Sequence, residues 1–233
     1  MMLEIDALTA AYGSAQILNG VRLDVGEGEV VALLGRNGVG KTTLMKTAMG
    51  LVPATGGQVS LHGRDVTNMP THGIARAGIG YVPQGRGIFD KLTVEENLRM
   101  GLRANPSASA DIPAYIFERF PILAERRQQI AGTMSGGQKQ QLAISRAMCG
   151  APKVLLLDEP SEGIQPNIVQ DIGLFLRQLV TTTKISILLI EQNLGLVKGA
   201  ADRFAIMVKG EIVHRGLPAE LEDENLLQRY LSV

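Results

Sequence analysis

The sequence predicts an α/β fold with a parallel central sheet, on the basis of three apolar segments and a helix between two of them. The segments Val30–Leu34, Val154–Leu157 and Ile185–Ile190 are almost entirely apolar, as expected for strands that are buried on both faces of a parallel sheet. A helical pattern that opens with Pro166 separates the last two segments. A strand, a helix and a strand in this order predict a βαβ unit.

Short strands separated by glycines are expected in the N-terminal part of the chain. These strands are Leu3–Leu8, Leu18–Val25 and Gln58–His62. Near the other end, Phe204–Val208 and Glu211–His214 predict a hairpin with a glycine-containing turn. A short helix is expected from about Pro218.

A glycine-rich loop follows the first buried strand and opens a helix that is expected over Lys41–Met49. The loop fits the pattern G-x-x-x-x-G-K-[ST] and consists of Gly35, Arg36, Asn37, Gly38, Val39, Gly40, Lys41 and Thr42, with Thr43 directly after it. Glycines let backbone N–H groups approach phosphate oxygens, and the helix N-terminus adds positive potential. We expect Lys41 to reach the β- and γ-phosphates and the Thr42 hydroxyl to bind Mg²⁺. Because the pattern and its strand–helix context coincide, a nucleotide phosphate site is favoured over a glycine-rich turn without a ligand.

Residues 86–150 contain no convincing strand and predict a helical subdomain that is inserted into the α/β core. A polar stretch, Asn105–Pro113, lies within it. The chain would then be a single domain, with residues 1–85 and 151–233 forming the core.

A capping box is expected inside this helical subdomain. Ser135 and Gln138 have the spacing that starts a helix, which would run to about Met148. The two residues between them, Gly136 and Gly137, exceed what a helix cap requires. They leave a helix N-terminus that can bind an anion, so this segment is a second candidate phosphate site.

Two carboxylates end the apolar segment Val154–Leu157. Asp158 can hold Mg²⁺ through water, and Glu159 can orient and deprotonate an attacking water. An ordinary strand end that is capped by acidic residues is the alternative. The phosphate loop earlier in the chain favours the catalytic interpretation.

The composition argues against several other classes of protein. The 23 basic and 23 acidic residues balance, which argues against a nucleic-acid partner. The single cysteine excludes a disulfide framework and a cysteine-based zinc site, and it fits a reducing compartment. No apolar run reaches the ~20 residues of a membrane span, and no signal-peptide pattern is found. We therefore expect an intracellular protein.

Four motifs resemble those of the ATP-binding subunits of ABC transporters and occur in the same order. They are the phosphate loop, Gln84 after Val82-Pro83, the segment Ser135–Gln138 and the pair Asp158-Glu159. The resemblance covers essentially the whole chain, and Ser135–Gln138 is its most specific part because other enzymes with a phosphate loop lack it. Met134 replaces the usual leucine before this segment. The resemblance implies the α/β fold of an ABC ATPase, which is a P-loop NTPase core with an N-terminal antiparallel β subdomain and an inserted helical subdomain.

The same resemblance implies ATP and Mg²⁺ as ligands and assigns further roles. Tyr12 would stack on adenine, with a core tyrosine at a strand end as the alternative. Gln84 would contact Mg²⁺ and the attacking water and begin the segment that senses a membrane partner. Ser135 and Gly137 would bind the γ-phosphate that the P-loop of a second subunit holds. The active site would therefore be composite, and a single subunit would hydrolyse ATP poorly.

Partners and location also follow from the resemblance. The expected partners are membrane permease subunits, a second ABC ATPase subunit that is either identical or related, and indirectly a solute-binding protein. The chain would be cytoplasmic and peripheral on the inner face of the cell membrane. Closure of two subunits on two ATP, hydrolysis and reopening would drive the permease.

Two positions depart from the pattern of many relatives. Gln192 follows Ile185–Ile190 where many relatives have histidine. Glutamine donates and accepts hydrogen bonds but carries no proton as an imidazolium does, which favours Glu159 as the general base with Gln192 positioning the phosphate. Gln165 replaces a common aspartate in the loop that would connect the two ATP sites.

The departures narrow the expected function. A glutamine at the position of Gln192 is typical of the ATP-binding subunits of importers for branched-chain amino acids, amides and urea. Within this group, three segments look most similar to the urea-type subunit: Gly35–Thr42, Ile79–Arg86 and Glu162–Pro166. We expect ATP hydrolysis that drives urea uptake, with a branched-chain amino acid or amide importer as the alternative. A non-transport ABC ATPase is disfavoured because no tandem cassette, coiled-coil insertion or basic stretch is found. A regulatory module without turnover is disfavoured by Glu159.

Overall fold

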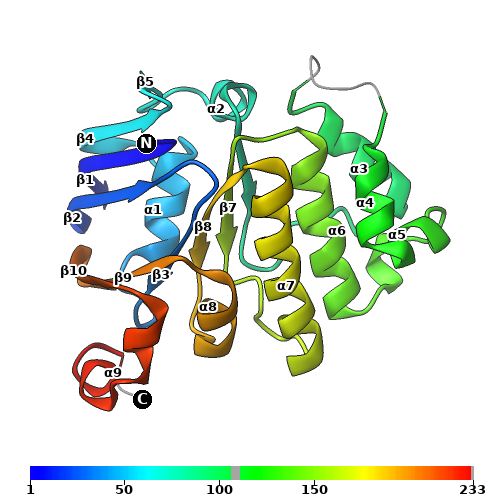
Figure 1. The fold of residues 1–233 in the computed structure, drawn as a ribbon. Coiled ribbons are helices and arrows are strands. Elements are labelled where there is room, and N and C mark those ends of the chain that lie inside the picture. The colour runs from blue at the N-terminus through cyan, green and yellow to red at the C-terminus, as the bar shows by residue number, and fades with distance from the viewer. Residues whose placement is uncertain (106–110, 232–233) are drawn as a thin grey trace.

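The computed structural model describes residues 1–105 and 111–231 and confirms the expected fold class (Figure 1). One sheet consists of β1 (Leu3–Tyr12), β2 (Ala15–Val25), β4 (Ala54–Leu61) and β5 (Arg64–Asp65). The other consists of β3 (Val30–Leu34), β6 (Ile79–Val82), β7 (Val154–Asp158), β8 (Ser186–Ile190), β9 (Arg203–Val208) and β10 (Glu211–Gly216). The first sheet is antiparallel with the order β2-β1-β4-β5, and the second has the order β10-β9-β3-β8-β7-β6.

The centre of the six-stranded sheet confirms the three apolar strands that the sequence predicts. Every residue of β3, β7 and β8 is buried, and the pairs β3–β8 and β7–β8 are parallel. The outer strand β10 is antiparallel to β9. Since parallel strands have their carboxyl ends at one edge, the loops after β3, β7 and β8 meet there, where α/β sheets usually bind ligands.

Helices cover the six-stranded sheet and form a separate group on the side away from the first sheet (Figure 1). The helices of the core are α1 (Lys41–Ala48), α2 (Thr71–Ala77), α7 (Pro166–Thr183), α8 (Leu194–Ala200) and α9 (Glu224–Tyr230). The separate group consists of α3 (Val94–Leu102), α4 (Ala114–Arg119), α5 (Pro121–Glu125) and α6 (Gly136–Cys149). Short 3₁₀ turns span Ala131–Thr133 and Pro218–Glu222.

The described part of residues 86–150 is helical, as predicted, and no strand occurs in it. An isolated bridge joins Thr93 to Ile130 there. Of the polar stretch Asn105–Pro113, residues 106–110 lie outside the described residues. Gly101 lets α3 approach α6 closely, because a side chain there would meet the Arg146 carbonyl oxygen.

Two apolar clusters lie on opposite faces of the six-stranded sheet, because side chains alternate along a strand. Val31 and Leu33 belong to the cluster that also contains the first sheet and Leu44 of α1. Val30 and Ala32 belong to the cluster that contains the helices α3 to α8. Helix α1 is thus buried together with residues of both sheets.

Several boundaries differ from the sequence-based expectations. Strand β1 continues beyond Leu8, because Tyr12 pairs with Ala15 across a turn at Gly13 and extends the hairpin. Strand β4 starts at Ala54 rather than Gln58 because it pairs along β1. Strand β6 and helices α2 and α8 were not predicted.

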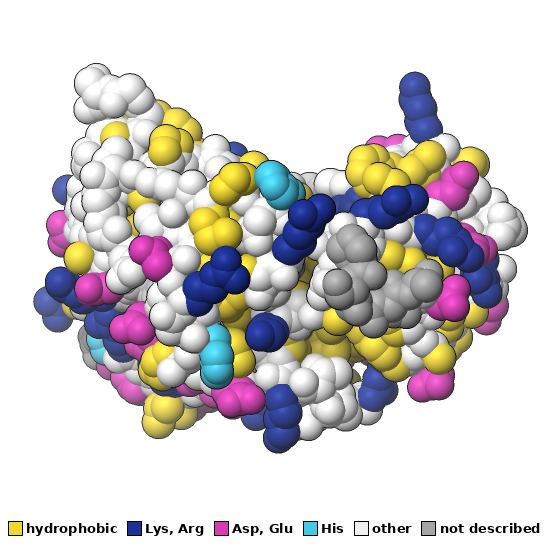
Figure 2. Space-filling model, turned by 90° about the horizontal axis from the view of Figure 1, so that it is seen from above, with side chains coloured by type: hydrophobic (Ala, Val, Ile, Leu, Met, Phe, Trp, Pro, Cys, Tyr) yellow, Lys and Arg dark blue, Asp and Glu magenta, His cyan; other side chains and the backbone are white. Residues whose placement is uncertain are grey.

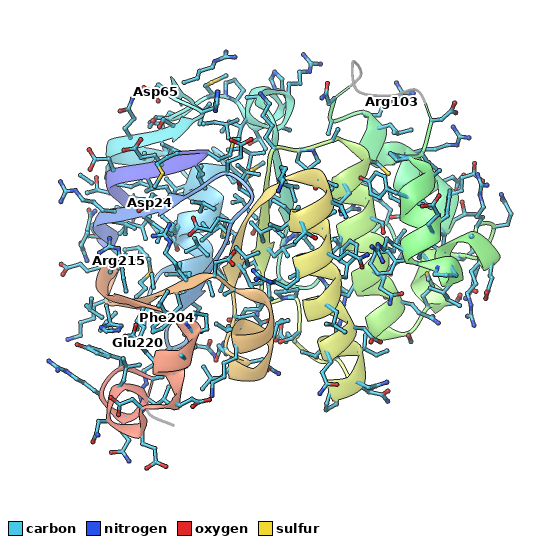
Figure 3. All side chains as sticks on the ribbon, in the orientation of Figure 1. Asp24, Asp65, Arg103, Phe204, Arg215 and Glu220 are labelled. Carbon is cyan, nitrogen blue, oxygen red and sulfur yellow. The ribbon has the colours of Figure 1, made fainter. Side chains whose placement is uncertain are left out.

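The C-terminal segment packs onto the hairpin of β9 and β10, where Phe204 and Glu220 lie near each other (Figure 3). The His214 ring has centroid distances of 5.6 Å to Phe204 and 6.0 Å to Tyr230. Its Nε2 lies 3.4 Å from Glu220 Oε2. This histidine therefore helps to pack the C-terminal segment against the hairpin.

The molecular surface is mixed in character. Seen from above, Lys and Arg side chains alternate with acidic and apolar ones, and apolar side chains gather over the helical subdomain (Figure 2). None of the helices within residues 1–105 and 111–231 has the length and hydropathy that crossing a membrane requires.

Candidate functional site

The phosphate loop joins β3 to α1 and has the geometry that its glycines allow. A side chain at Gly35 would lie 2.5 Å from the Met207 carbonyl oxygen, and Gly40, which caps α1, has a φ of 113°. Both positions therefore need glycine. Lys41 is 5% exposed, and its Nζ donates hydrogen bonds to the carbonyl oxygens of Gly35 at 2.6 Å and Arg36 at 3.0 Å.

A cavity of about 560 Å³ opens beside this loop. It is lined by the phosphate loop, Gln84 and residues from the segments 159–162 and 191–193. These segments follow β3, β6, β7 and β8, so the parallel sheet brings several of the predicted residues to one edge, namely Asn37, Gly38, Gly40, Lys41, Thr42, Thr43, Gln84, Glu159 and Gln192. The candidate site is therefore a single cavity made of chain segments that are distant in sequence.

The oxygens that would bind Mg²⁺ come from Asp158, the last residue of β7, and from Thr42 in the first turn of α1. Thr42 Oγ1 donates to Asp158 Oδ1 at 3.3 Å, and the Tyr81 hydroxyl donates to Asp158 Oδ2 at 3.4 Å. Asp158 is 1% exposed, and this burial raises the pKa of its carboxyl, while the hydrogen bond from Thr42 acts in the opposite direction. A bound cation would favour the charged carboxylate, which fits the placement of a buried acid here.

The donor set fits Mg²⁺ together with a nucleotide. A hydroxyl and a carboxylate are hard oxygen ligands, which this ion prefers. Among the described residues there is no group of three or more His, Cys, Asp or Glu that could hold a metal alone. Phosphate oxygens and waters would have to complete the coordination, as is usual for Mg²⁺ in nucleotide sites.

Glu159, the candidate general base, is held by the other predicted side chains. Its Oε1 accepts a hydrogen bond from Gln192 Nε2 at 2.6 Å, and its Oε2 accepts one from Gln84 Nε2 at 3.2 Å. Lys41 Nζ lies 3.8 Å from Oε1. Gln192 Nε2 also donates to Asn37 Oδ1 at 2.8 Å, which ties it to the phosphate loop. One carboxylate thus connects three of the segments that line the cavity.

The backbone at Glu159 has a φ of 49°, which is uncommon for a residue with a side chain. Its N–H donates to the Ile190 carbonyl oxygen at 2.9 Å, which holds the turn after β7 against the end of β8. Such a conformation costs on the order of 1 kcal/mol and persists where the surrounding structure enforces it. Here it directs the carboxylate into the cavity.

Burial and charge act against each other at Lys41. Burial lowers the pKa of the Lys41 ammonium, and the neighbouring carboxylates of Glu159, Asp158 and Glu191 act in the opposite direction. The Lys41 ammonium therefore lies at the wall of the cavity with three carboxylates close to it. An anionic nucleotide would supply further negative charge beside it.

The segment Ser135–Gln138 forms the predicted capping box but lies outside the cavity lining. Gln138 N donates to Ser135 Oγ at 3.4 Å, and Ser135 N donates to Gln138 Oε1 at 3.0 Å. Packing also explains the glycine at position 137, since a side chain at Gly137 would meet Ile168 at 2.8 Å. Within one chain this segment is not part of the site, and its action on the nucleotide of a second subunit stays a prediction.

Tyr12 is 50% exposed at the end of β1, so the alternative of a core tyrosine is wrong. Its role in adenine stacking stays a prediction. We expect Tyr12→Ala to weaken ATP binding by about 1–3 kcal/mol, or about 5- to 150-fold, because the adenine would lose its stacking partner. Titration with a fluorescent ATP analogue measures this change. Tyr12→Phe keeps the ring and should bind nearly as the wild type does, and equal affinity of both variants would exclude the stacking role.

Three contributors to the site were not predicted. Tyr81 contacts Asp158, Glu162 Oε2 accepts from Gln84 Nε2 at 3.1 Å, and Glu191 contacts Ser161. Glu191 itself could be noticed in the sequence, because a charged residue directly follows a nearly apolar strand, but its contact with Ser161 could not. Tyr81 had no comparable signal, since its contact depends on β6 pairing with β7.

Comparison with known proteins adds a family and several relatives. The family described as "ABC transporter" matches residues 18–162. The chain is 41% identical over 221 residues to the high-affinity branched-chain amino acid transport ATP-binding protein BraG of Pseudomonas aeruginosa, covering 94% of each chain. It is 34% identical to the probable branched-chain amino acid transport ATP-binding protein LivF of Archaeoglobus fulgidus, covering 98% of this chain and 97% of that one. It is also 34% identical to the lipopolysaccharide export system ATP-binding protein LptB of Escherichia coli, covering 97% and 95%.

A solved structure supports the same fold. The ADP conformation of an ATP-binding cassette of an ABC transporter superposes with a TM-score of 0.82 and 27% identity. The superposition covers 100% of this chain and 99% of the other. The arrangement of two sheets and inserted helices is therefore shared over the full length of both chains.

Proposed function

This chain belongs to the ABC transporter family and is an ATP-hydrolysing subunit of such a transporter, and from that premise we propose that it drives uptake of branched-chain amino acids. The observation that carries the proposal is the 41% identity to BraG over 94% of both chains. The probable LivF of Archaeoglobus fulgidus supports it further. LptB, of a lipopolysaccharide export system, is 34% identical, as LivF is, so the higher identity to BraG decides the proposal.

The urea-type specificity that the motif spelling favours has no support among the relatives named above. The spelling of these motifs is a poor guide to the solute, and this has a chemical reason. Residues of Gly35–Thr42, and Gln84 of Ile79–Arg86, line the cavity proposed for ATP, so the spelling of these segments would follow the ATP chemistry rather than the solute. We therefore propose the branched-chain amino acid alternative in place of the urea-type function.

The residues of the cavity account for ATP hydrolysis in the proposed mechanism. Lys41 would bind the phosphates, and Thr42 and Asp158 would hold Mg²⁺, which neutralises phosphate charge when bound. Glu159 would accept a proton from the attacking water. Gln192 already donates to Glu159 Oε1 and would keep this carboxylate in place beside the γ-phosphate.

The proposed partners are a second ATPase subunit, permease subunits and, indirectly, a solute-binding protein. The position of Ser135–Gln138 outside the cavity supports action on the nucleotide of a second subunit. The helical subdomain exposes Phe89, Met100 and Ile130 by 44%, 46% and 44%, which supports docking onto a protein. The chain would then lie on the cytoplasmic face of the membrane, held there by the permease.

Transport by the assembled complex tests this function. The tagged chain would be purified from its native membranes with its associated subunits and reconstituted in vesicles with the solute-binding protein. We expect ATP-dependent uptake of labelled leucine and no ATP-dependent uptake of labelled urea. A complex that carries Lys41→Ala controls for leakage. Urea uptake without leucine uptake would contradict the proposal and restore the urea-type alternative.

A further inference from the structure

A buried carboxylate that the proposed hydrolysis chemistry does not use lies in the loop after β8, next to the residue that contacts the candidate base Glu159. Glu191 directly follows β8 and is 1% exposed. Its Oε1 accepts a hydrogen bond from Ser161 N at 2.9 Å, and its Oε2 accepts one from Ser161 Oγ at 2.9 Å. The backbone N–H groups of Gln192 and Asn193 also donate to Oε2, at 2.9 and 3.0 Å. Four donors from two loops therefore converge on one side chain.

These donors belong to the two loops that hold the catalytic pair. Ser161 lies two residues beyond Glu159, in the loop after β7. Gln192, in the loop after β8, donates through its side chain to Glu159 and to Asn37. Glu191 thus connects the two loops to each other, and the side chains of Gln192 and Glu159 form a second contact between the same loops.

The need to fill buried space does not explain why residue 191 is a glutamate, because an apolar side chain would fill the same space. A buried negative charge beside a site for an anionic nucleotide is unfavourable unless it is compensated. The compensation comes from the four donors, all of which a carboxylate can accept and an apolar side chain of the same size cannot. The arrangement is therefore suited to fixing the two loops relative to each other.

We propose that Glu191 is a positioning residue for ATP hydrolysis, which holds Gln192 and the Ser161 loop so that Gln192 meets the Glu159 carboxylate. This inference rests on the proposed role of Glu159 as the base. Small displacements of a catalytic group lower turnover strongly, by up to about 100-fold for about 1 Å. Loss of Glu191 should act on turnover and leave ATP binding by the phosphate loop nearly unchanged.

The first test separates turnover from binding. In the full chain, Glu191→Leu removes all four hydrogen bonds, and we expect kcat to fall about 10- to 100-fold while the Kd for ATP stays within about twofold. Glu191→Gln keeps the oxygen that accepts three of the four bonds, so its kcat should lie between those of Glu191→Leu and the wild type. An unchanged kcat in Glu191→Leu would overturn the inference.

The second test asks whether Glu191 acts through Gln192. In a Gln192→Ala background, Glu191→Leu should lower kcat by no more than about a further twofold, because the side chain that it positions is already gone. If the two losses simply multiply, Glu191 does not act through Gln192 and the inference fails. Should Glu191→Leu not fold, Glu191→Gln serves in the same cycle.

Glu29 provides a matched control for stability. It precedes β3, at the opposite end of that strand from Glu191, and its Oε2 accepts hydrogen bonds from Gly26 N at 2.6 Å and Arg203 Nη2 at 2.9 Å. Arg203 also contacts Asp24, whose position at the edge of the first sheet is labelled in Figure 3. We expect Glu29→Leu to lower the melting temperature without lowering kcat per folded molecule. If Glu191→Leu behaves in the same way, its role is structural only.

The failure of this inference can be told apart from failure of the proposed function. If the wild-type chain, purified with its associated subunits, does not hydrolyse ATP, or if the same complex with Glu159→Gln hydrolyses ATP fully, the proposed chemistry itself is contradicted. Normal wild-type hydrolysis and loss of it in Glu159→Gln, together with wild-type kcat in Glu191→Leu, would contradict the positioning role alone.

Discussion

Replacing Glu159 with glutamine is expected to lower ATP hydrolysis by about 100- to 10,000-fold. Glutamine has nearly the same shape and can keep a hydrogen bond with a neighbouring amide, but it cannot take a proton from water. ATP binding should remain, because Lys41 and the phosphate loop are unchanged. The variant should therefore accumulate with ATP bound, as a stable dimer that does not reopen.

Phosphate release measures the loss, and size-exclusion chromatography with and without ATP detects the dimer. Glu211→Gln serves as the control, since Glu211 is exposed on the terminal hairpin and should leave both readouts unchanged. Hydrolysis at the wild-type rate by Glu159→Gln would assign the base to another group.

Replacing Lys41 with alanine is expected to weaken ATP binding strongly and to abolish ATP hydrolysis. Lys41 Nζ is the only side-chain cation among the described residues that line the cavity, where Asp158, Glu159 and Glu191 lie close to it. Without it, phosphate would approach these acids with no cation between them. Truncating one partner of a buried charge pair costs about 2–5 kcal/mol, so the Kd should rise about 30-fold or more.

Titration with a fluorescent ATP analogue measures this affinity. Lys46→Ala is the matched control, because Lys46 lies on the same helix, in its last turn, and does not line the cavity. An unchanged Kd in Lys41→Ala would mean that the glycine-rich loop is not the phosphate site.

The sequence predicts the centre of the fold well and its edges less well. Strands β3, β7 and β8 are apolar along nearly their full length, and such segments have few alternatives to a buried parallel strand. By contrast, Ile79–Val82 is only four residues long and contains Gly80, so its local strand signal is short and interrupted. It becomes β6 because β7 offers a parallel edge, which is a tertiary effect that local patterns do not contain.

The candidate site was predicted where a single segment carries the chemistry. The phosphate loop and Glu159 could be identified from their own motifs, and the cavity brings them together. The contacts of Tyr81 with Asp158 and of Glu191 with Ser161 could not be predicted, because they join loops whose proximity depends on the order of strands in the sheet. The urea-type specificity stays unconfirmed for a related reason, since the motifs on which it rests belong to the proposed ATP site and not to a solute site.

The left-handed backbone at Glu159 has a consequence for evolution and engineering. Glycine would adopt this conformation without strain, so Glu159→Gly would relax the turn while removing the base. Selection for thermal stability alone would then reward an inactive protein. Libraries of this chain that are screened for heat resistance without an activity assay should accumulate glycine at this position, and persistence of glutamate there marks selection for turnover.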